Sequence, residues 1–483
     1  MRWTPETLAE AAGGRLRQAG DGPIATAFID SRTPRRDALF VALVAARDGH
    51  EFIPAAAEAG ASACLIAAGR PIPPGCEHLT VVEVDDTLAG LTALGRAARA
   101  SIHGPVVAIT GSNGKTTTRA FVEAAVATGY APVLCTHGNF NNHLGVPLTL
   151  VDEPHEPAAA VLELGMSAPG ENAHLAEIVA PTIHVITSIA LEHLEFMGSL
   201  AAIAAAEAEP IAALRPDADG RPPALIVPSD EPTLIPHLPG PESGVRVLRV
   251  GPEQADQPDP SLEVAITEVE VGARTRVVLR LRGHAESLTL RLRTFGAHNA
   301  RNAASAVAVA LHLGLPLGPL VAALEAVEPV GDRGRLRELG PHLLIADCYN
   351  ANPGSMGVAL DSLARLRAAR PGKLVAVLGD MLELGPTELE LHRDVGERAA
   401  ALGIDAVLGF GPRAAAIVEG ARAGGIAADH LEGAGGAVAV AQAAAWVRAQ
   451  LGDQPGAALF KASRGIRLER VVAALSEAAP TGA

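Results

Sequence analysis

TGSNGKTTT, residues 110–118, follows the apolar run VVAI of residues 106–109 and precedes a segment that can form a helix over residues 116–128. A continuous apolar run of this kind is typical of a strand buried in a parallel sheet. Glycines in such a turn let successive backbone N–H groups converge on phosphate oxygens, and the N-terminus of the helix adds partial positive charge. The stretch is therefore either an ordinary strand-to-helix turn or a phosphate-binding turn.

The residue types within the turn favour phosphate binding. Lys115 can bridge the β- and γ-phosphates of a nucleoside triphosphate, and the Thr116 hydroxyl can reach Mg²⁺. The usual P-loop pattern has a glycine where this chain has Ile109, so the match to that pattern is incomplete. We predict that a nucleoside triphosphate is bound by Gly111, Ser112, Asn113, Gly114, Lys115, Thr116 and Thr117.

Strand-like and helix-like segments alternate on both sides of the turn, which predicts an α/β protein with parallel sheets. We expect strands at residues 38–43, 63–66, 160–162, 184–187, 225–227, 343–345, 374–378, 406–408 and 457–460, and antiparallel strands at 274–279 and 288–292. Residues 53–59 and 433–447 are expected to be helical, the second as a buried or amphipathic helix. Residues 236–260 are rich in Pro, Gly and Asp and are predicted to form an exposed loop. The expected domains are residues 1–102, 103–328 and 329–483.

The composition agrees with this organisation and excludes several classes of protein. The chain has 483 residues, of which 48% are hydrophobic and 19% charged, so it can form about three folded domains. Its net charge of −15 disfavours binding to nucleic acid or to an anionic membrane. The four cysteines lie far apart, and no secretion signal or membrane-spanning stretch is evident. We expect a cytoplasmic protein without membrane insertion or a nucleic-acid partner.

Two further side chains could help to bind a metal ion near the turn. Glu163 stands at the end of a predicted buried strand, and His193 follows the predicted strand that ends near residue 187. Ligands of open α/β sheets bind at these ends of the strands. Mg²⁺ keeps several waters, so Thr116 and Glu163 would be sufficient protein ligands around a triphosphate. His193 is either a third ligand or a capping or core histidine.

Three polar runs follow other predicted strands, and each alone is ambiguous. Residues 136–147, THGNFNNHLGVP, concentrate amides that can both donate and accept hydrogen bonds. The runs DCYNANP at 347–353 and KASR at 461–464 also follow strands. Each is either a ligand-binding segment or a surface turn.

Taken together and in order, these motifs resemble the Mur ligase family. The resemblance rests on GSNGKTTT, HGNFNNHLGVP, ELGMSAPGE (163–171), HLEFMGS (193–199), GAHNARN (296–302), DCYNANPGSM (347–356), LGDMLELG (378–385) and KASRG (461–465), and it covers nearly the whole chain. It implies a three-domain architecture: a small UDP-sugar-binding α/β domain, a central P-loop-type ATPase domain and a C-terminal Rossmann-like domain. The YNANP and LGDMLELG runs are similar to those of the member that uses ATP and Mg²⁺ to add D-alanyl-D-alanine to UDP-N-acetylmuramoyl-tripeptide in peptidoglycan synthesis.

The resemblance also implies roles for individual residues. Lys115, Glu163 and His193 correspond to catalytic positions, with Thr116, Glu163 and His193 as metal ligands. His298 and Asn299 resemble adenine contacts, and Arg335 and Asp347 resemble the third domain's contacts with the nucleotide. Positions that would bind or enclose the other substrates are Ser31, Arg32, Asn139, Asn141, Asn142, Asn350, Asn352, Lys461, Ser463 and Arg464.

The sequence departs from the family pattern where relatives carry a lysine that is carbamylated in several members. Glu207 stands there instead, and we hypothesise that it is catalytic because its carboxylate supplies the anionic group directly. The alternative is an exposed helix glutamate. Ser188, Ala190 and Ala462 also differ from the pattern.

Other functions are compatible with parts of this pattern. A related Mur-type or folylpolyglutamate-type ligase would use the same chemistry on another carboxylate and acceptor. A nucleotide-binding switch or a homologue with little catalysis would keep the turn without the reaction. We expect a monomer.

Overall fold

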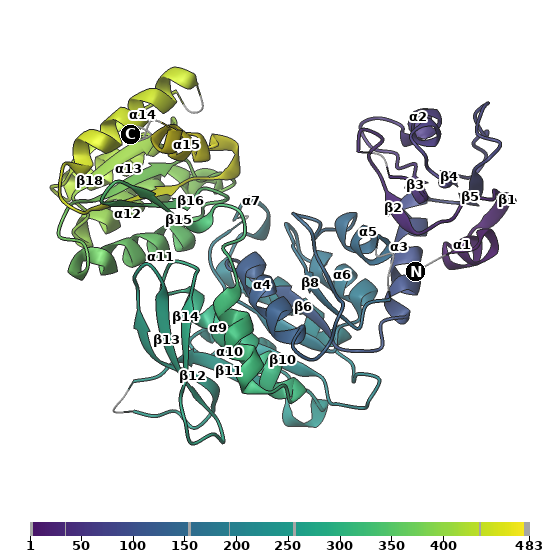
Figure 1. The fold of residues 1–483 in the computed structure, drawn as a ribbon, viewed down its shortest axis with the longest axis horizontal. Helices are drawn as coiled ribbons and strands as arrows, with labels where there is room; N and C mark the ends of the chain where they lie inside the picture. The colour runs from purple at the N-terminus through teal and green to yellow at the C-terminus, as the bar shows by residue number, and fades with distance from the viewer. Residues whose placement is uncertain are drawn as a thin grey trace, which may run out of the picture.

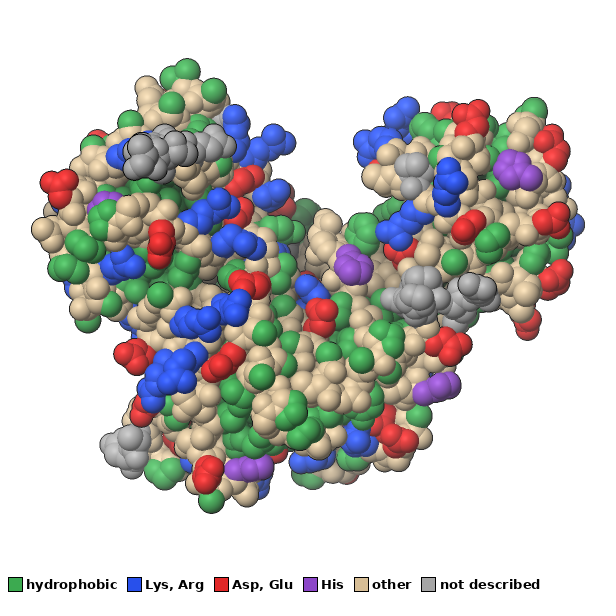
Figure 2. Space-filling model, viewed as in Figure 1, with side chains coloured by type: hydrophobic (Ala, Val, Ile, Leu, Met, Phe, Trp, Pro, Cys, Tyr) green, Lys and Arg blue, Asp and Glu red, His purple; other side chains and the backbone are tan. Residues whose placement is uncertain are grey.

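The computed structural model describes residues 3–33, 35–152, 156–192, 194–254, 257–433 and 436–477. These residues form three α/β domains, each built on its own sheet. The middle domain lies between the other two, and the first and third domains rise from it on opposite sides (Figure 1). The molecular surface is hollowed between the first and third domains, above the middle one (Figure 2).

The first domain contains a five-stranded sheet in the order β1-β5-β4-β3-β2, in which only the β1–β5 pair is antiparallel. Its helix α1 begins after Thr4, whose side chain caps the helix. The predicted strands at 38–43 and 63–66 and the helix at 53–59 are confirmed as β3, β4 and α2. The elements are β1 (Arg15–Gln18), β2 (Thr26–Phe28), β3 (Ala38–Val41), β4 (Ala63–Ala67), β5 (Thr80–Val84), α1 (Pro5–Ala11), α2 (Ile53–Glu58) and α3 (Thr87–Ala100).

The middle domain contains a nine-stranded sheet in the order β14-β13-β12-β11-β10-β9-β6-β8-β7. Strands β6 to β12 run parallel, and β13 and β14 extend the sheet as antiparallel strands, as predicted. The strands are β6 (Val106–Thr110), β7 (Val133–Cys135), β8 (Ala159–Glu163), β9 (Ile183–Ile186), β10 (Ala224–Pro228), β11 (Arg246–Pro252), β12 (Leu262–Glu270), β13 (Thr275–Leu281) and β14 (Leu288–Leu292). The helices are α4 (Lys115–Val126), α5 (Gly145–Val151), α6 (Glu171–Val179), α7 (Leu194–Met197), α8 (Leu200–Ala208), α9 (Asn299–Leu313) and α10 (Leu317–Ala326).

The central strand β6 explains the apolar run ahead of the glycine turn. Val107 and Ile109 face the core beneath α4 and α9, whereas Val106 and Ala108 face the opposite core. Both faces of β6 are therefore buried, and every position must be apolar.

The prediction of an exposed loop over residues 236–260 is wrong in its middle part. Strand β11 lies within that stretch and pairs in parallel with β10 and β12. Leu248 and Val250 on β11 are buried. Prolines and glycines flank this short strand and dominate the composition of the stretch. Composition alone therefore did not reveal the alternating apolar residues of the strand.

The third domain contains a six-stranded sheet in the order β15-β16-β20-β17-β18-β19, parallel except for the β15–β16 pair. Its elements are β15 (Arg333–Leu339), β16 (His342–Asp347), β17 (Leu374–Gly379), β18 (Ala406–Phe410), β19 (Ala427–Leu431), β20 (Ala457–Lys461), α11 (Pro353–Ala364), α12 (Glu388–Ala401), α13 (Ala414–Ala423), α14 (Ala437–Leu451) and α15 (Glu469–Glu477). The predicted helix at 433–447 is α14, and it buries one face against the sheet. Among the helices described here, none is long and apolar enough to span a bilayer.

Helix α3 connects the first and middle domains through a shared core. One hydrophobic cluster runs from Leu8 and Leu39 in the first domain through Leu91 on α3 to Leu162 and Leu175 in the middle domain. Arg99, near the end of α3, donates to the carbonyl oxygens of Ile102, Val179 and Ala180. This buried guanidinium ties α3 to the C-terminal end of α6, and its burial lowers the pKa of Arg99 to about 10.

Candidate active site

The glycine turn connects the end of β6 to the start of α4, as the sequence predicts. Gly111 and Gly114 have φ angles of +115° and +89°, a region that side chains rarely adopt. A Cβ atom on Gly111 would lie 2.2 Å from Thr187 Oγ1, and one on Gly114 would lie 2.8 Å from Asn302 Oδ1. Only glycine therefore fits these two positions, and the backbone stays open toward the N-terminus of α4.

Lys115 is the first residue of α4 and lies half-buried at the turn. Its ammonium group donates to the carbonyl oxygen of Gly111. Burial lowers the pKa of Lys115, but the carboxyl groups of Glu192, Glu207 and Glu163 act in the opposite direction and leave the pKa raised overall. The turn therefore holds a positive charge where a triphosphate would bind.

Thr116 and Glu163 meet as the sequence predicts for a metal site. The Thr116 hydroxyl donates to Glu163 Oε2 at 3.1 Å, and Arg119 Nε donates to Glu163 Oε1 at 3.0 Å. A hydroxyl and a carboxylate are hard oxygen donors that suit Mg²⁺, although Arg119 competes for one carboxylate oxygen. His193 lies outside the described residues, and within those residues no cluster of three or more His, Cys, Asp or Glu side chains could hold a metal ion.

Glu207 lies beneath the glycine turn, near the end of α8. Its side chain is 1% exposed, so the alternative of an exposed helix glutamate is wrong. Glu207 Oε2 accepts from the Gly111 N–H at 2.8 Å and from Asn172 Nδ2 at 3.1 Å. Burial raises the pKa of Glu207 to about 7, with Glu192 acting in the same direction and Lys115 opposing it.

The amide-rich run lies at the start of α5. Asn142 Oδ1 accepts from the N–H groups of Leu144 and Gly145, so this side chain caps the helix, while Asn139 is exposed. Asn141 is packed beside Gly165, because a Cβ there would lie 2.8 Å from Asn141 Nδ2. A cleft of about 440 Å³ opens next to Asn142, between this run and the first turn of α6.

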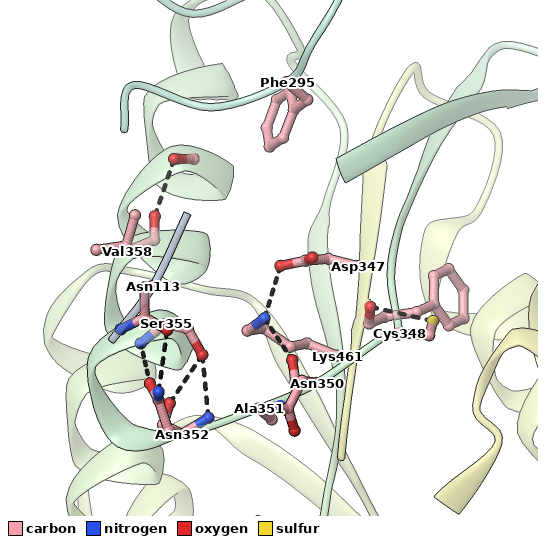
Figure 3. Close-up of polar contacts among 12 residues, drawn as sticks. Asn113, Phe295, Asp347, Cys348, Asn350, Ala351, Asn352, Ser355, Val358 and Lys461 are labelled. Carbon is pink, nitrogen blue, oxygen red and sulfur yellow. Dashed lines mark hydrogen bonds and ion pairs between the residues drawn. The ribbon is translucent and has the colours of Figure 1, made fainter. Parts of the chain in front are cut away.

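The third domain reaches the glycine turn through Asn352, the cap of α11. Asn352 Nδ2 donates to Asn113 Oδ1 at 2.9 Å, and Asn352 Oδ1 accepts from the Ser355 N–H at 2.8 Å (Figure 3). Lys461 Nζ donates to Asp347 Oδ2 at 2.7 Å and to the Asn350 carbonyl oxygen at 3.0 Å (Figure 3). The structure thus joins the runs 347–353 and 461–464, which are far apart in sequence, and the first of them contacts the turn through Asn352.

Ser463 and Arg464 complete this third-domain group. The Ser463 hydroxyl accepts from the Leu382 N–H at 3.1 Å and donates to the Ala351 carbonyl oxygen at 3.3 Å. Arg464 forms an ion pair with Glu469 at 3.4 Å and lies 5.7 Å from the centre of the Tyr349 ring. Ser463 therefore fixes the loop, whereas the Arg464 side chain is 63% exposed and open to a ligand.

The two predicted adenine contacts differ in how they are held. Asn299 is 2% exposed; its Nδ2 donates to the Phe295 carbonyl oxygen, and its Oδ1 accepts from Asn302 Nδ2. Both ends of this amide are engaged inside the protein. The side chain of His298 is reached by solvent, yet desolvation by the protein around it lowers its pKa to about 4, with Asp347 opposing that shift.

Three comparisons with known proteins place the chain in a family. Residues 109–310 match the model of the Mur ligase middle domain, and residues 334–462 match the Mur ligase glutamate ligase domain. The chain is 34% identical to the UDP-N-acetylmuramoyl-tripeptide–D-alanyl-D-alanine ligase of Bacillus subtilis, with 99% of each chain covered. It belongs to the Mur ligase family.

Solved structures of Mur ligases resemble the whole fold. A crystal structure of MurF from Acinetobacter baumannii matches with a TM-score of 0.84 and 30% identity over 99% of both chains. MurF ligase from Thermotoga maritima in complex with ADP matches with a TM-score of 0.78 and 26% identity over 94% of this chain and 97% of that one. The predicted three-domain Mur ligase architecture is thereby confirmed.

Within this Mur ligase, the first-domain segment is the least enclosed of the predicted sites. Arg32 forms a forked pair with Asp30, with nitrogen–oxygen distances of 2.7 to 3.2 Å, and its side chain is 87% exposed. The hydrogen bond from Arg32 lowers the pKa of Asp30 to about 2. Ser31 lies half-buried between them in sequence.

The sequence interpretation missed one arginine at the boundary between the middle and third domains. Arg335, the predicted nucleotide contact, donates to the carbonyl oxygens of Gly331 and Pro329. Arg333 instead lies 3.6 Å over the Tyr349 ring, and its charge opposes the overall rise in the pKa of Lys115. The strand register shifts between Arg333 and Arg335, where Gly334 has a φ of +71°. A bulge redirects neighbouring side chains in this way, and the sequence pattern did not reveal it.

Asn172, His184 and Asn302 were also missed as contributors to the site. Asn302 accepts from Thr118 on α4 and lies within the GAHNARN run, so that run contained a signal for it. Asn172 and His184 lie in buried segments whose sequence gave no indication of a polar role. Asn302 lies beside Gly114, His184 contacts Thr110 just before the turn, and Asn172 reaches the turn indirectly through Glu207.

Proposed function

We propose that this Mur ligase joins D-alanyl-D-alanine to UDP-N-acetylmuramoyl-tripeptide at the expense of ATP and so produces the pentapeptide precursor of peptidoglycan. The observation that carries the proposal is the charged Lys115 in a glycine turn, beside the Thr116–Glu163 pair. It stands in a chain that is similar over its whole length to a ligase named for these substrates.

The proposed reaction has two steps. An oxygen of the tripeptide carboxylate attacks the γ-phosphorus of ATP, and the bond from that phosphorus to the β-phosphate oxygen breaks. The products of this step are ADP and an acyl phosphate. The amine of D-alanyl-D-alanine then attacks the acyl carbon, phosphate leaves with the carbon–oxygen bond pair, and the amine loses a proton. The first step brings a carboxylate against the negatively charged γ-phosphate, and the second builds negative charge on the acyl oxygen beside the phosphate. The site must therefore supply cations and oriented donors.

Residues of this chain fit these requirements. The amides of the glycine turn and the Lys115 ammonium would bind the phosphates and stabilise the charge that builds on them. Asn352 and the Lys461–Asp347 pair would align the third domain over the nucleotide, with Asn350, Ser463 and Arg464 facing the dipeptide. Positioning of this kind contributes roughly 7–11 kcal/mol in favourable cases.

Mg²⁺ would be held by Thr116 and Glu163, with His193 as a further proposed ligand. The ion would supply positive charge between the phosphate oxygens. Asn141 and Asn142 would contact the UDP-linked peptide, and Ser31 and Arg32 its UDP-sugar end.

The remaining features of the proposal concern the whole molecule. We place the domain boundaries after residues 102 and 328, between the three sheets, and we propose a monomer that works in the cytoplasm, where ATP and the UDP-linked precursor are found. The sheets span residues 15–84, 106–292 and 333–461, which supports these boundaries.

The test is a coupled assay of phosphate release with mass spectrometry of the products. The enzyme is incubated with ATP and Mg²⁺ together with a panel of UDP-muramoyl peptides and amine acceptors. We expect release only when both UDP-N-acetylmuramoyl-tripeptide and D-alanyl-D-alanine are present, and a product heavier by the dipeptide minus water. Release with neither substrate would indicate a nucleotide switch, release with another pair would indicate a different Mur-type ligase, and no release would indicate a silent homologue.

A further inference from the structure

A chain of buried polar side chains runs beneath the glycine turn. His184 on β9 contacts Thr110 at the end of β6, Thr110 contacts Glu207 on α8, and Glu207 contacts Asn172 on α6. All four side chains are at most 1% exposed. They come from four different elements, and Glu207 connects them to the first residue of the turn, Gly111.

The hydrogen-bond directions within this chain are fixed by its chemistry. The Thr110 hydroxyl has one proton, which it donates to the Glu207 carbonyl oxygen at 3.0 Å. His184 Nε2, 2.9 Å from the same hydroxyl, must therefore be the donor, so the ring carries its proton on Nε2. Burial lowers the pKa of His184 to about 3, which agrees with a neutral ring.

Hydrogen bonds also fix the position of the Glu207 carboxyl group. Asn172 Nδ2 donates to the Ala206 carbonyl oxygen at 3.2 Å and to Glu207 Oε2 at 3.1 Å, so the orientation of its amide is unambiguous. The same Oε2 atom accepts a hydrogen bond from the Gly111 N–H at 2.8 Å. The first amide of the turn is thus committed to Glu207, and the position of Glu207 sets the course of the turn toward Lys115.

This arrangement lowers the stability of the folded protein more than an apolar core at the same place would. Among the described residues, His184 Nδ1 and Asn172 Oδ1 are buried acceptors without a protein donor. Buried acceptors without partners lower stability, and apolar side chains of similar size would avoid that loss. A role in shaping the turn accounts for polar groups at these positions.

We propose that His184 and Asn172 are positioning residues for nucleotide binding, which act through Thr110 and Glu207 to hold the Gly111 amide in place. The proposal rests on the proposed function only in taking the glycine turn as the nucleotide site. Neither side chain would touch the nucleotide, so their effect should appear in affinity for ATP and not in affinity for the other substrates.

The first test removes one hydroxyl and compares it with a matched control. Thr182→Val removes another buried hydroxyl between β6 and β9, at Val106, which is the opposite end of β6 from the turn. We expect Thr110→Val to weaken binding of ATP by about fivefold, measured by calorimetry without the other substrates, and Thr182→Val by less than twofold. Melting temperatures should fall by similar amounts, and Thr110→Ser should restore affinity to within twofold of the native protein.

A second variant covers the case in which Thr110→Val does not fold. Asn172→Leu keeps the volume but removes the donor to Glu207, and we expect it to raise the KM for ATP about tenfold while the KM for D-alanyl-D-alanine stays constant. Because both substitutions act through Glu207, the loss of ATP affinity in the double variant Thr110→Val/Asn172→Leu should be smaller than the product of the two single losses.

The outcomes separate this proposal from the function on which it rests. Equal losses of ATP affinity in Thr110→Val and Thr182→Val, or multiplicative losses in the double variant, would overturn the positioning role even if the ligase product forms. Tight ATP binding without any ligated product would contradict the proposed function and leave the positioning role supported. If the native protein bound no ATP, both would be wrong.

Discussion

The glycine turn and the first-domain segment at residues 30–32 hold their charged groups in opposite ways. Lys115 is enclosed by carboxyl groups from three different parts of the middle domain, and the turn beside it is bonded to α8. Within the described part of the chain, Arg32 pairs only with Asp30, two residues away, and it is largely exposed. The proposed nucleotide end of the site therefore has its charges arranged by the protein itself, whereas the cation at the proposed UDP-sugar end is left largely open to solvent.

The largest expected effect is that of Lys115→Ala. Loss of the ammonium removes the cation that we propose to face the γ-phosphate, and we expect phosphate release to fall at least about 100-fold. Steady-state assays with saturating substrates measure this. If the variant retained more than a tenth of the activity, the Lys115 charge at the turn would not be the main cation that stabilises the transferred phosphate.

A smaller effect on the KM for ATP should distinguish two neighbouring arginines. Arg333 lies on the Tyr349 ring and acts on Lys115, whereas Arg335 is bonded to the backbone beside it. We expect Arg333→Ala to raise the KM for ATP about tenfold and Arg335→Ala about twofold, measured in parallel with melting curves. The reverse order would favour Arg335, the arginine predicted from the sequence, over Arg333 as the nucleotide contact.

The buried carboxyl group of Glu207 should make stability depend on pH. Burial raises its pKa from 4.5 to about 7, so between these values the native state keeps a proton that the unfolded state has lost. The contribution of Glu207 to the free energy of unfolding therefore falls as pH rises from 4.5 to 7, by at most about 3 kcal/mol. Glu207→Gln should remove this part of the decline, so the variant gains stability relative to the native protein between pH 5 and pH 8 in urea titrations.

Glu177→Gln is the matched control, because Glu177 is 68% exposed and pairs only with Arg96 at 3.3 Å among the described residues. Its pH dependence should match that of the native protein. A parallel pH profile for Glu207→Gln would show that the carboxyl group is ionised in the folded protein at all these pH values.

The smallest effect is expected at the exposed end of the site. Arg32→Ala should change the free energy of unfolding by less than about 0.5 kcal/mol, because an exposed ion pair contributes little. The KM for the UDP-linked peptide should rise a few fold, while the KM for ATP stays constant. A large loss of stability would show that this segment is more ordered by the protein than its exposure indicates.

Local spacing was enough to predict the glycine turn, Lys115 and the Thr116–Glu163 contact, because a strand end and a helix start bring these residues together. The burial of Glu207 was beyond such reasoning, since its partners Asn172 and Gly111 lie 35 and 96 residues away. The contact of Arg333 with Tyr349 was not anticipated, because the register shift at Gly334 changes the direction of neighbouring side chains on β15. Strand β11 was missed because its neighbours in the sheet, and not its composition, make it a strand.

The hydrophobic cluster that includes Leu39, Leu91 and Leu162 has a consequence for dissecting the chain. A fragment that stops after residue 102 would expose the face of α3 that packs against α5 and α6, and Arg99 would lose its acceptors on α6. Such a fragment should aggregate when expressed alone. In calorimetry of the intact protein, residues 3–328 should melt in a single cooperative transition. The first two domains would then have separate roles in binding but fold as one unit.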